Sequence, residues 1–179
     1  MSVLMALAVV SDHGFLSTSK DVNLLSAFSS AGLIQLDGTG QVASWQATIW
    51  PSGGSGAVMI NPDAPADTKQ RVADLLSKLL KDPESGLARI VSKDELARLG
   101  AWPEAAFAVE LKPGFTIGSR TSGPLVTGSS YRGMHGYHPD DRYSDACFLS
   151  DREPPVELRT VIDIYDCMHH AAFHTCAAD

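Results

Sequence analysis

An acidic side chain and an imidazole stand next to each other at the end of an apolar segment. Asp12 and His13 follow the run over residues 3–10. A carboxylate and an imidazole are good ligands for zinc or a similar divalent ion. Neighbouring strand residues normally point to opposite faces, but Gly14 follows and lets the backbone turn. The pair therefore indicates metal ligands, although Asp12 could instead simply cap a loop at a polar strand end.

A histidine among glycines is the second candidate ligand. His135 has Gly133 before it and Gly136 directly after it. Glycines let the backbone approach a site closely and leave the imidazole uncrowded. His138 follows, and together with Tyr137 it could line a pocket, but spacing on a loop does not fix a shared ion. Taken alone, this segment favours a loop histidine in water over a metal ligand.

The segment before Asp12 must position the first pair. Residues 3–10 are continuously apolar, which is typical of a parallel strand buried on both faces. In open α/β sheets, ligands bind at the carboxyl ends of such strands. The run has neither a basic segment nor a small-residue cleavage pattern, so we interpret it as a strand rather than a signal peptide. It is also too short to span a bilayer.

Helical and strand patterns alternate along the rest of the chain, which predicts an α/β fold. The clearest helix covers residues 67–81, where apolar residues recur with helical spacing. Further helices are predicted over residues 21–31 and 92–99, the second opened by a capping box from Ser92 to Glu95. The remaining predictions are a hairpin over 33–50 turning at 37–40, a flexible glycine-rich link at 53–56, strands at 57–60, 88–91, 107–111, 115–117 and 146–149, and a long loop over 119–132.

Together, the two histidine segments indicate a protein family more specifically than either segment does alone. They read Ser-Asp-His-Gly-Phe over residues 11–15 and Gly-Met-His-Gly-Tyr over residues 133–137. This pair resembles two signatures of the type I phosphodiesterase and nucleotide pyrophosphatase family, within the alkaline phosphatase superfamily. Residues 44–47, 50–55 and 123–126 also resemble bacterial members. The resemblance covers residues 3–149 and implies the C-terminal portion of an alkaline-phosphatase-like sheet sandwiched by helices, with a mixed α+β insertion.

The resemblance implies a site for two Zn²⁺ ions. Asp12 and His13 would ligate the zinc that activates the nucleophile, and His135 would ligate the other zinc. A Thr or Ser nucleophile would form a covalent phosphoenzyme. Two such ions can clamp the attacking and leaving oxygens of an in-line displacement. The implied activity is hydrolysis of phosphate esters as a phosphodiesterase, nucleotide pyrophosphatase or phosphatase, with a nucleotide or small phosphate ester as the substrate.

The family's nucleophile and remaining ligands lie before the Ser-Asp-His-Gly strand. We therefore expect this chain to be a fragment that is inactive alone and binds zinc weakly or partially, since zinc sites need three or four protein ligands. The strand at residues 3–10 would then have an uncovered edge. The last part, 151–179, departs from the family pattern. It carries His169, His170 and His174, which we regard as incidental rather than as a metal site.

These patterns divide the chain into four parts. Residues 1–32 hold the core strand, metal motif and a helix, and residues 33–118 form an inserted α+β subdomain. Residues 119–150 hold the metal-binding loop and a core strand, and residues 151–179 form the divergent tail. Three cysteines, all near the C-terminus and without CxxC spacing, do not indicate a disulfide framework.

Composition restricts the possible partners. The net charge of -7 and the scattered basic residues argue against nucleic acid as a partner. No membrane segment is predicted, and the sequence leaves the localisation open, although family members are often exported or periplasmic. Two other functions stay open. One is a non-catalytic α/β module that binds a partner through its sheet edge, and the other is a self-sufficient metallohydrolase that completes its site with His138 or a tail histidine.

Overall fold

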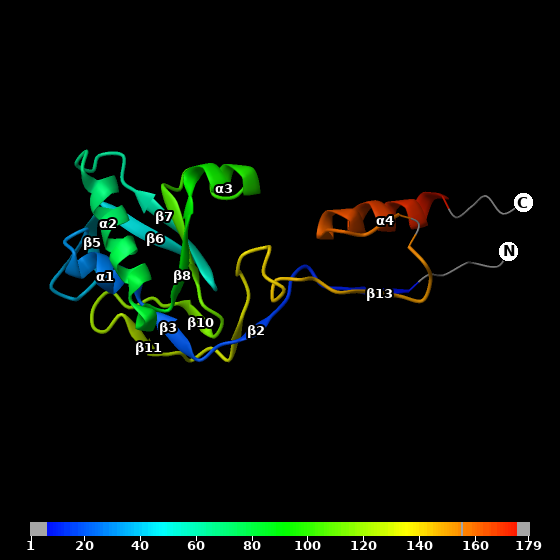
Figure 1. Ribbon diagram of the computed structural model, residues 1–179, viewed down its shortest axis with the longest axis horizontal. Helices are drawn as coiled ribbons and strands as arrows, with labels where there is room; N and C mark the ends of the chain where they lie inside the picture. The colour runs from blue at the N-terminus through cyan, green and yellow to red at the C-terminus, as the bar shows by residue number, and fades with distance from the viewer. Residues whose placement is uncertain (1–6, 155, 175–179) are drawn as a thin grey trace, which may run out of the picture. The chain divides into compact units, whose positions relative to one another are not determined.

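The chain folds as two compact units, which are described separately. The computed structural model describes residues 7–154 and 156–174. The terminal unit comprises Met1–Gly14 and Ser144–Asp179, and the central unit comprises Phe15–Tyr143. Figure 1 labels their helices and strands. The mixed α/β class predicted from the sequence is confirmed.

A four-stranded antiparallel sheet forms the centre of the central unit. Its order is β6-β7-β9-β8, with β6 at Ala47–Ser52, β7 at Ser55–Ile60, β9 at Phe107–Leu111 and β8 at Leu87–Ser92. The β6–β7 ladder continues to the pair Ser52 and Ser55. Gly53 and Gly54 are therefore a tight hairpin turn rather than a flexible link. Gly53 takes a φ of 71°, which such turns require and which glycine adopts without strain.

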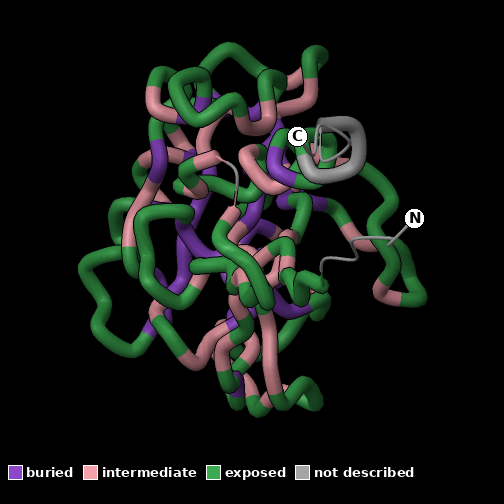
Figure 2. Tube along the Cα trace, turned by 90° about the vertical axis from the view of Figure 1, so that its right-hand side faces the viewer, coloured by how far each residue is buried: buried purple, intermediate pink, exposed green. Residues whose placement is uncertain are grey.

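Side-chain alternation gives this sheet two apolar faces. Val58 and Val109 point to one face and pack with the helices α1 (Leu24–Ser30) and α2 (Thr68–Lys81). Ala57 and Ala108, the residues before them, pack on the opposite face with Leu96 of helix α3 (Lys93–Leu99). The sheet is thus covered by helices on both faces, and the buried segments that result are purple in Figure 2.

The ends of α3 follow the predicted capping pattern. The Ser92 side chain accepts a hydrogen bond from the Glu95 backbone N–H at 3.3 Å, and Gly100 closes the helix with a φ of 66°. Helix α2 begins and ends as the apolar periodicity predicted, and the 3-10 turn η1 (Pro83–Ser85) follows it. These two helices are therefore specified locally by the sequence.

A three-stranded sheet, β10-β3-β11, differs from the prediction. Strand β3 (Lys20–Val22) pairs in parallel with β10 (Phe115–Ile117) and antiparallel with β11 (Val126–Gly128). The predicted helix over 21–31 therefore begins at Leu24, and the predicted loop over 119–132 contains a strand. Buried Asn23 explains this tertiary pairing, since its amide donates to the Pro124 carbonyl and the Thr127 hydroxyl.

The predicted hairpin over 33–50 is confirmed only in its first part. Strands β4 (Ile34–Leu36) and β5 (Val42–Trp45) pair antiparallel. The Asp37 side chain accepts hydrogen bonds from the Thr39 hydroxyl and from backbone N–H groups of the turn, which lower the pKa of its carboxyl. At Gln46 the chain leaves this hairpin and enters β6, where Arg71 of α2 donates to the Gln46 amide oxygen at 2.9 Å.

The terminal unit contains an antiparallel ribbon and a helix. Strand β1 (Ala8–Val10) pairs with β13 (Phe148–Ser150), and α4 covers Val161–His174. The described part of the predicted strand over 3–10 is therefore antiparallel and not buried: Leu7, Val9 and Leu149 are 66%, 56% and 65% exposed. Among the described strands β1 has only β13 as a partner, so the other edge of β1 has no partner strand there. The rest of that predicted strand lies outside the described residues.

The tail that follows β13 is helical in its second half. The Asp163 carboxylate accepts hydrogen bonds from the Thr160 and Arg159 backbone N–H groups at the start of α4, and these lower the pKa of that carboxyl. Cys147 and Cys167 are free thiols, and Cys176 lies outside the described residues. None of the helices in the described part of the chain is long and apolar enough to span a bilayer.

Helix α2 buries one of its faces against the sheet. Truncating two of its leucines should therefore lower the free energy of unfolding by unequal amounts. Leu76 is fully buried in the core, whereas Leu80 is 37% exposed. Leu76→Ala should lower the free energy of unfolding by about 2–5 kcal/mol, because it leaves a cavity. Leu80→Ala should cost less than about 1 kcal/mol. Urea denaturation of both variants measures this, and equal losses would contradict the described face of α2.

Candidate functional site

Hydrogen bonds within the terminal unit hold the segment that carries Asp12 and His13. The Ser11 backbone N–H donates to the Cys147 carbonyl at 3.0 Å, and the Cys147 N–H returns a bond to the Ser11 hydroxyl at 2.8 Å. The Gly14 N–H donates to the Ser144 carbonyl at 3.1 Å. The two candidate ligands thus lie on a segment that is fixed on both sides.

The donor atoms of Asp12 and His13 lie close together. His13 Nδ1 is 2.8 Å from the Gly14 carbonyl oxygen, which can only accept, so Nδ1 carries the proton. In the neutral ring Nε2 is then the basic nitrogen, and it lies 3.5 Å from Asp12 Oδ1. Two ligands of one tetrahedral zinc, each about 2.0–2.1 Å from the ion, stand about 3.3 Å apart. The pair therefore fits a shared zinc ion.

A short strand pair positions the His135 loop in the central unit. Strand β12 (Gly133–Met134) pairs antiparallel with β2 (Leu16–Ser17). A side chain on Gly133 would overlap the Phe15 ring, and that ring lies 6.3 Å from the His135 imidazole between centroids. The end of the first motif thus packs on the start of the second. His135 itself is exposed.

Glycines also dock this loop on the β6–β7 turn. The Gly54 N–H donates to the His135 carbonyl at 2.9 Å. A Cβ on Gly53 would overlap that same carbonyl, and a Cβ on Gly136 would overlap the Ser52 carbonyl. Gly136 also has a φ of 77°, so another residue would be strained there in addition to clashing. Backbone contact therefore fixes the position of His135.

Tyr137 completes this contact. Its ring is buried against Gly54, where no Cβ would fit, and its hydroxyl donates to the Phe115 carbonyl at 2.7 Å. Burial raises the pKa of the Tyr137 phenol, so it stays a hydrogen-bond donor at neutral pH. Tyr137 thus fixes the loop to the β6–β7 turn and to strand β10.

Gly54→Ala should displace the loop, because its methyl group would overlap the Tyr137 ring. We expect the free energy of unfolding to fall by about 1–3 kcal/mol and the amide signals of residues 133–138 to shift in ¹H–¹⁵N NMR spectra. Gly128→Ala is the matched control, since a Cβ there meets nothing within 4 Å. Unchanged loop signals in Gly54→Ala would contradict the described contact.

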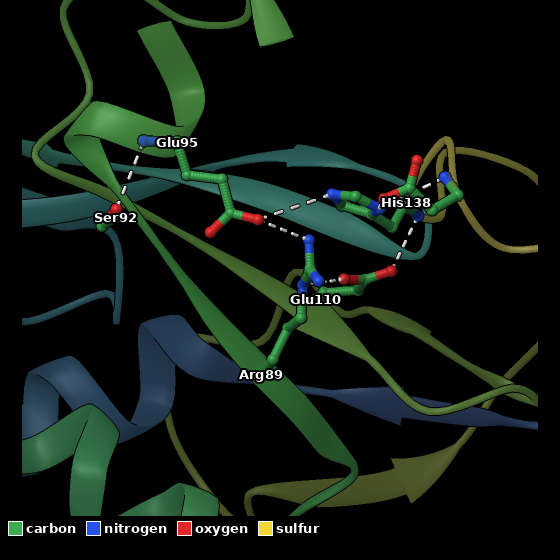
Figure 3. Close-up of polar contacts among 6 residues, drawn as sticks. Arg89, Ser92, Glu95, Glu110 and His138 are labelled. Carbon is green, nitrogen blue, oxygen red and sulfur yellow. Dashed lines mark hydrogen bonds and ion pairs between the residues drawn. The ribbon is translucent and has the colours of Figure 1, made fainter. Parts of the chain in front are cut away.

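A partly buried polar network follows Tyr137 (Figure 3). The His138 backbone N–H donates to Glu110 Oε1 at 2.7 Å. Arg89 Nε forms an ion pair with Glu110 Oε2 at 2.8 Å, although its N–H is not aligned for a hydrogen bond. Arg89 Nη2 also donates to Glu95 Oε1 at 2.9 Å. This network ties the loop to strands β8 and β9 and to helix α3.

Burial dominates the acid–base behaviour of Glu110. Its side chain is 4% exposed. Loss of hydration raises its pKa most, and a hydrogen bond with the Asp141 side chain raises it further. The His138 backbone N–H and the charge of Arg89 offset only part of that rise. The protonated form is therefore favoured more in the folded chain than in the unfolded chain.

The raised pKa of Glu110 predicts a pH-dependent contribution to stability. A carboxyl whose folded pKa is raised stabilises the fold most below its ordinary value of 4.5 and loses that contribution as pH rises through the folded pKa. The stability of the wild type relative to Glu110→Gln should therefore fall with pH above about 4.5. Urea denaturation at a series of pH values measures this.

Glu104→Gln, at an exposed position, controls for the loss of one negative charge. A difference between wild type and Glu110→Gln that stays constant with pH would contradict burial as the dominant cause.

The metal-ligand role of Asp12, His13 and His135 stays a prediction. The structure brings Asp12 and His13 together in the terminal unit and places His135 in the central unit, so their convergence stays a prediction. Among the side chains that the structure describes, those of residues 7–154 and 156–170, no three or more His, Cys, Asp or Glu form a group that could hold a metal ion. The hypothesis of a self-sufficient metallohydrolase, which needs His138 or a tail histidine to complete a site, stays a prediction.

Sequence reasoning missed Glu110, Arg89 and Glu95. One signal was present: Glu110 is the charged residue of the otherwise apolar strand β9, and such a residue needs a partner. The partners themselves could not be found in the same way, because Arg89 and Glu95 lie on other elements.

No protein-family model matches this chain, and no curated protein matches it either. Solved structures do match. The chain has the fold of nucleotide pyrophosphatase/phosphodiesterase-type proteins of the alkaline phosphatase superfamily, which confirms the predicted resemblance at the level of fold.

Three solved structures illustrate this similarity. Human ectonucleotide pyrophosphatase/phosphodiesterase 5 superposes with a TM-score of 0.52 and 16% identity over 93% of this chain and 40% of its own. The murine protein gives 0.50 and 18% over 81% and 33%, and it has also been solved as an inactive variant in complex with AMP. Phosphonoacetate hydrolase from Sinorhizobium meliloti 1021, in complex with phosphonoformate, gives 0.56 and 14% over 93% and 41%. The chain thus spans well under half the length of each of these proteins.

Proposed function

We propose that this chain forms part of a metal-dependent phosphoric ester hydrolase, of the phosphodiesterase, nucleotide pyrophosphatase or phosphatase type. The observation that carries the proposal is the pair of histidine motifs on a chain with the fold of such hydrolases. The close approach of Asp12 Oδ1 and His13 Nε2 supports it, because those atoms suit one zinc ion. The packing of Phe15 against His135 supports it further, because it joins the two motifs.

The residues of this chain would act by holding and orienting metal. Asp12 and His13 would ligate one zinc ion, with the Gly14 carbonyl fixing the ring tautomer of His13. His135 would ligate a second zinc ion from a loop that glycine contacts hold in place. When bound, such ions lower the pKa of a nucleophile and offset charge on phosphoryl oxygens.

The proposed substrate is a nucleotide or a small phosphate ester. The murine structure in complex with AMP supports a nucleotide, and the phosphonoformate complex of the bacterial enzyme supports a small phosphorus-containing acid. Within this chain, the exposed His135 imidazole beside the Phe15 ring is where such a molecule would meet the central unit.

We further propose that these 179 residues hydrolyse little by themselves. A zinc site needs three or four protein ligands, and the described residues contain no group of three. The other ligands and the nucleophile would then come from outside this sequence. Zinc binding by this chain should accordingly be weak.

Zinc titration tests the ligand assignment. We expect zinc to shift the ring signals of His13 and His135 in NMR spectra. Asp12→Ala should raise the zinc concentration that half-saturates the His13 shift by at least about tenfold. In parallel, the chain should show no turnover of bis(p-nitrophenyl) phosphate with zinc present. His169→Ala is the matched control, because His169 has no part in the proposal.

The outcomes separate the two parts of the proposal. Zinc that shifts neither ring contradicts the ligand assignment. Turnover that zinc supports and His135→Ala abolishes contradicts the incomplete site, and a nucleophile within this chain must then be sought.

A second candidate, from another class, is a non-catalytic binding module. The observation that favours it is the β1–β13 ribbon, whose apolar side chains Leu7, Val9 and Leu149 are mostly exposed. Exposed apolar strand edges invite pairing with another chain. This candidate predicts no response of His13 or His135 to zinc, so the same titration distinguishes it from the hydrolase.

A further inference from the structure

A buried carboxylate contacts the loop that carries His135. Glu110 is the charged residue of strand β9, and its side chain is 4% exposed. Its Oε1 atom accepts a hydrogen bond from the His138 backbone N–H at 2.7 Å. Burying a charge inside a sheet has a cost that an apolar residue at the same position would avoid. Because residues that break such a rule are expected at functional sites, Glu110 indicates a role beyond packing.

The segment from His135 to His138 is held at both of its ends. At the start, the His135 carbonyl accepts a hydrogen bond from the Gly54 N–H at 2.9 Å. At the other end, the His138 N–H donates to Glu110. Between these two bonds lies Gly136, whose φ of 77° is one that glycine adopts without strain. The backbone of this segment therefore has little freedom, and both anchors determine where the His135 side chain begins.

The two anchors are joined to each other by the sheet. Ser55, the first residue of β7, lies opposite Glu110 in the antiparallel β7–β9 ladder. The Leu111 N–H, next to Glu110, donates to the Gly54 carbonyl at 2.9 Å. The separation of Gly54 and Glu110 is therefore set by strand pairing. A loop attached to both of them takes its position from the sheet.

Arg89 fixes the orientation of the Glu110 carboxylate (Figure 3). Its Nε atom lies 2.8 Å from Glu110 Oε2, and its Nη2 atom donates to Glu95 Oε1 at 2.9 Å. A planar guanidinium held by carboxylates on two different elements has little freedom to rotate. The Asp141 side chain also hydrogen-bonds to the Glu110 carboxyl. Because groups of this chain engage both oxygens of a buried carboxylate, Glu110 is a positioning residue rather than a catalytic one.

We propose that Glu110, oriented by Arg89, positions His135 for metal binding through the His138 backbone N–H. The proposal rests on the proposed function, in which His135 ligates the second zinc ion. A ligand on an exposed loop binds more tightly when its backbone is ordered beforehand, because less freedom is then lost on binding. Groups that orient a metal ligand commonly change metal affinity by about 10–100-fold. Here the orienting group acts on the backbone three residues after the ligand.

Two substitutions of Glu110 separate its acceptor oxygen from its charge. Glu110→Leu removes both, and it should raise the zinc concentration that half-saturates the His135 ring shift in NMR spectra by about tenfold. Glu110→Gln removes the charge but keeps an oxygen that can accept from the His138 N–H, so the rise should be at most about threefold. His13 is the internal reference, because it lies in the terminal unit and its half-saturation should not change. Unchanged amide signals of α1 and α2 show that each variant is folded.

Arg89→Met provides a second test, which decides the question if Glu110→Leu does not fold. The Arg89 side chain is 41% exposed, so its replacement should leave the sheet intact. Zinc half-saturation at His135 should rise about threefold, the effect of one partly exposed ion pair. Removal of a positive charge by itself favours binding of a cation, so a rise cannot come from a direct electrostatic effect. Arg98→Met, which removes the same charge from an exposed position on α3, is the matched control and should cause no rise.

Weaker zinc binding at His135 but not at His13 in Glu110→Leu and Arg89→Met, with recovery in Glu110→Gln, supports the proposal. Unchanged half-saturation at His135 in the folded variants overturns the positioning role and leaves the hydrolase function standing. Binding as weak in Glu110→Gln as in Glu110→Leu also overturns it, since charge rather than the acceptor would then matter. If zinc does not shift the His135 ring in the unmodified chain, the ligand assignment fails and the positioning role fails with it.

Discussion

Direct backbone contact between two loops is the constraint on which the central unit depends. The β6–β7 turn and the His135 loop approach so closely that Gly53, Gly54 and Gly136 have no room for a Cβ. One hydrogen bond, from Gly54 to the His135 carbonyl, spans the contact. Because backbone cannot adjust as a side chain can, the position of His135 follows from the position of the sheet. A candidate ligand on an exposed loop is thereby given the fixed placement of a strand residue.

A hydrogen bond to a charged side chain also holds this loop in place. His138, three residues after His135, gives its backbone N–H to the buried carboxylate of Glu110, and Arg89 balances that carboxylate from the neighbouring strand. A buried charge is tolerated only when it is paired, so removing one partner should disturb the others. The loop is therefore coupled on one side to the β6–β7 turn and on the other to strands β8 and β9 and helix α3.

Local patterns in the sequence predicted those parts of the fold that local interactions determine. Helix α2 follows from its apolar spacing, α3 from Ser92 and Gly100, and the β4–β5 hairpin from the turn at Asp37. Prediction failed where a distant partner decides: β3 is a strand because β10 and β11 pair with it, and β1 is antiparallel because its partner among the described strands is β13. The candidate ligands Asp12, His13 and His135 came from the motif pair, whereas Arg89 and Glu95 have no signal before their partner Glu110 is placed.

The hydrogen bond from Gly14 to Ser144 has a consequence for how this chain could be rearranged. Residues 15–143 lie in the sequence between these two bonded residues, so the two chain ends of the central unit are adjacent. A segment whose two ends are adjacent can be transferred into another protein with little change in the surrounding chain. In the original protein a short linker could replace it. The β6–β7 turn and the glycine-docked His135 loop both lie within this one segment, so a transfer of residues 15–143 would move them together.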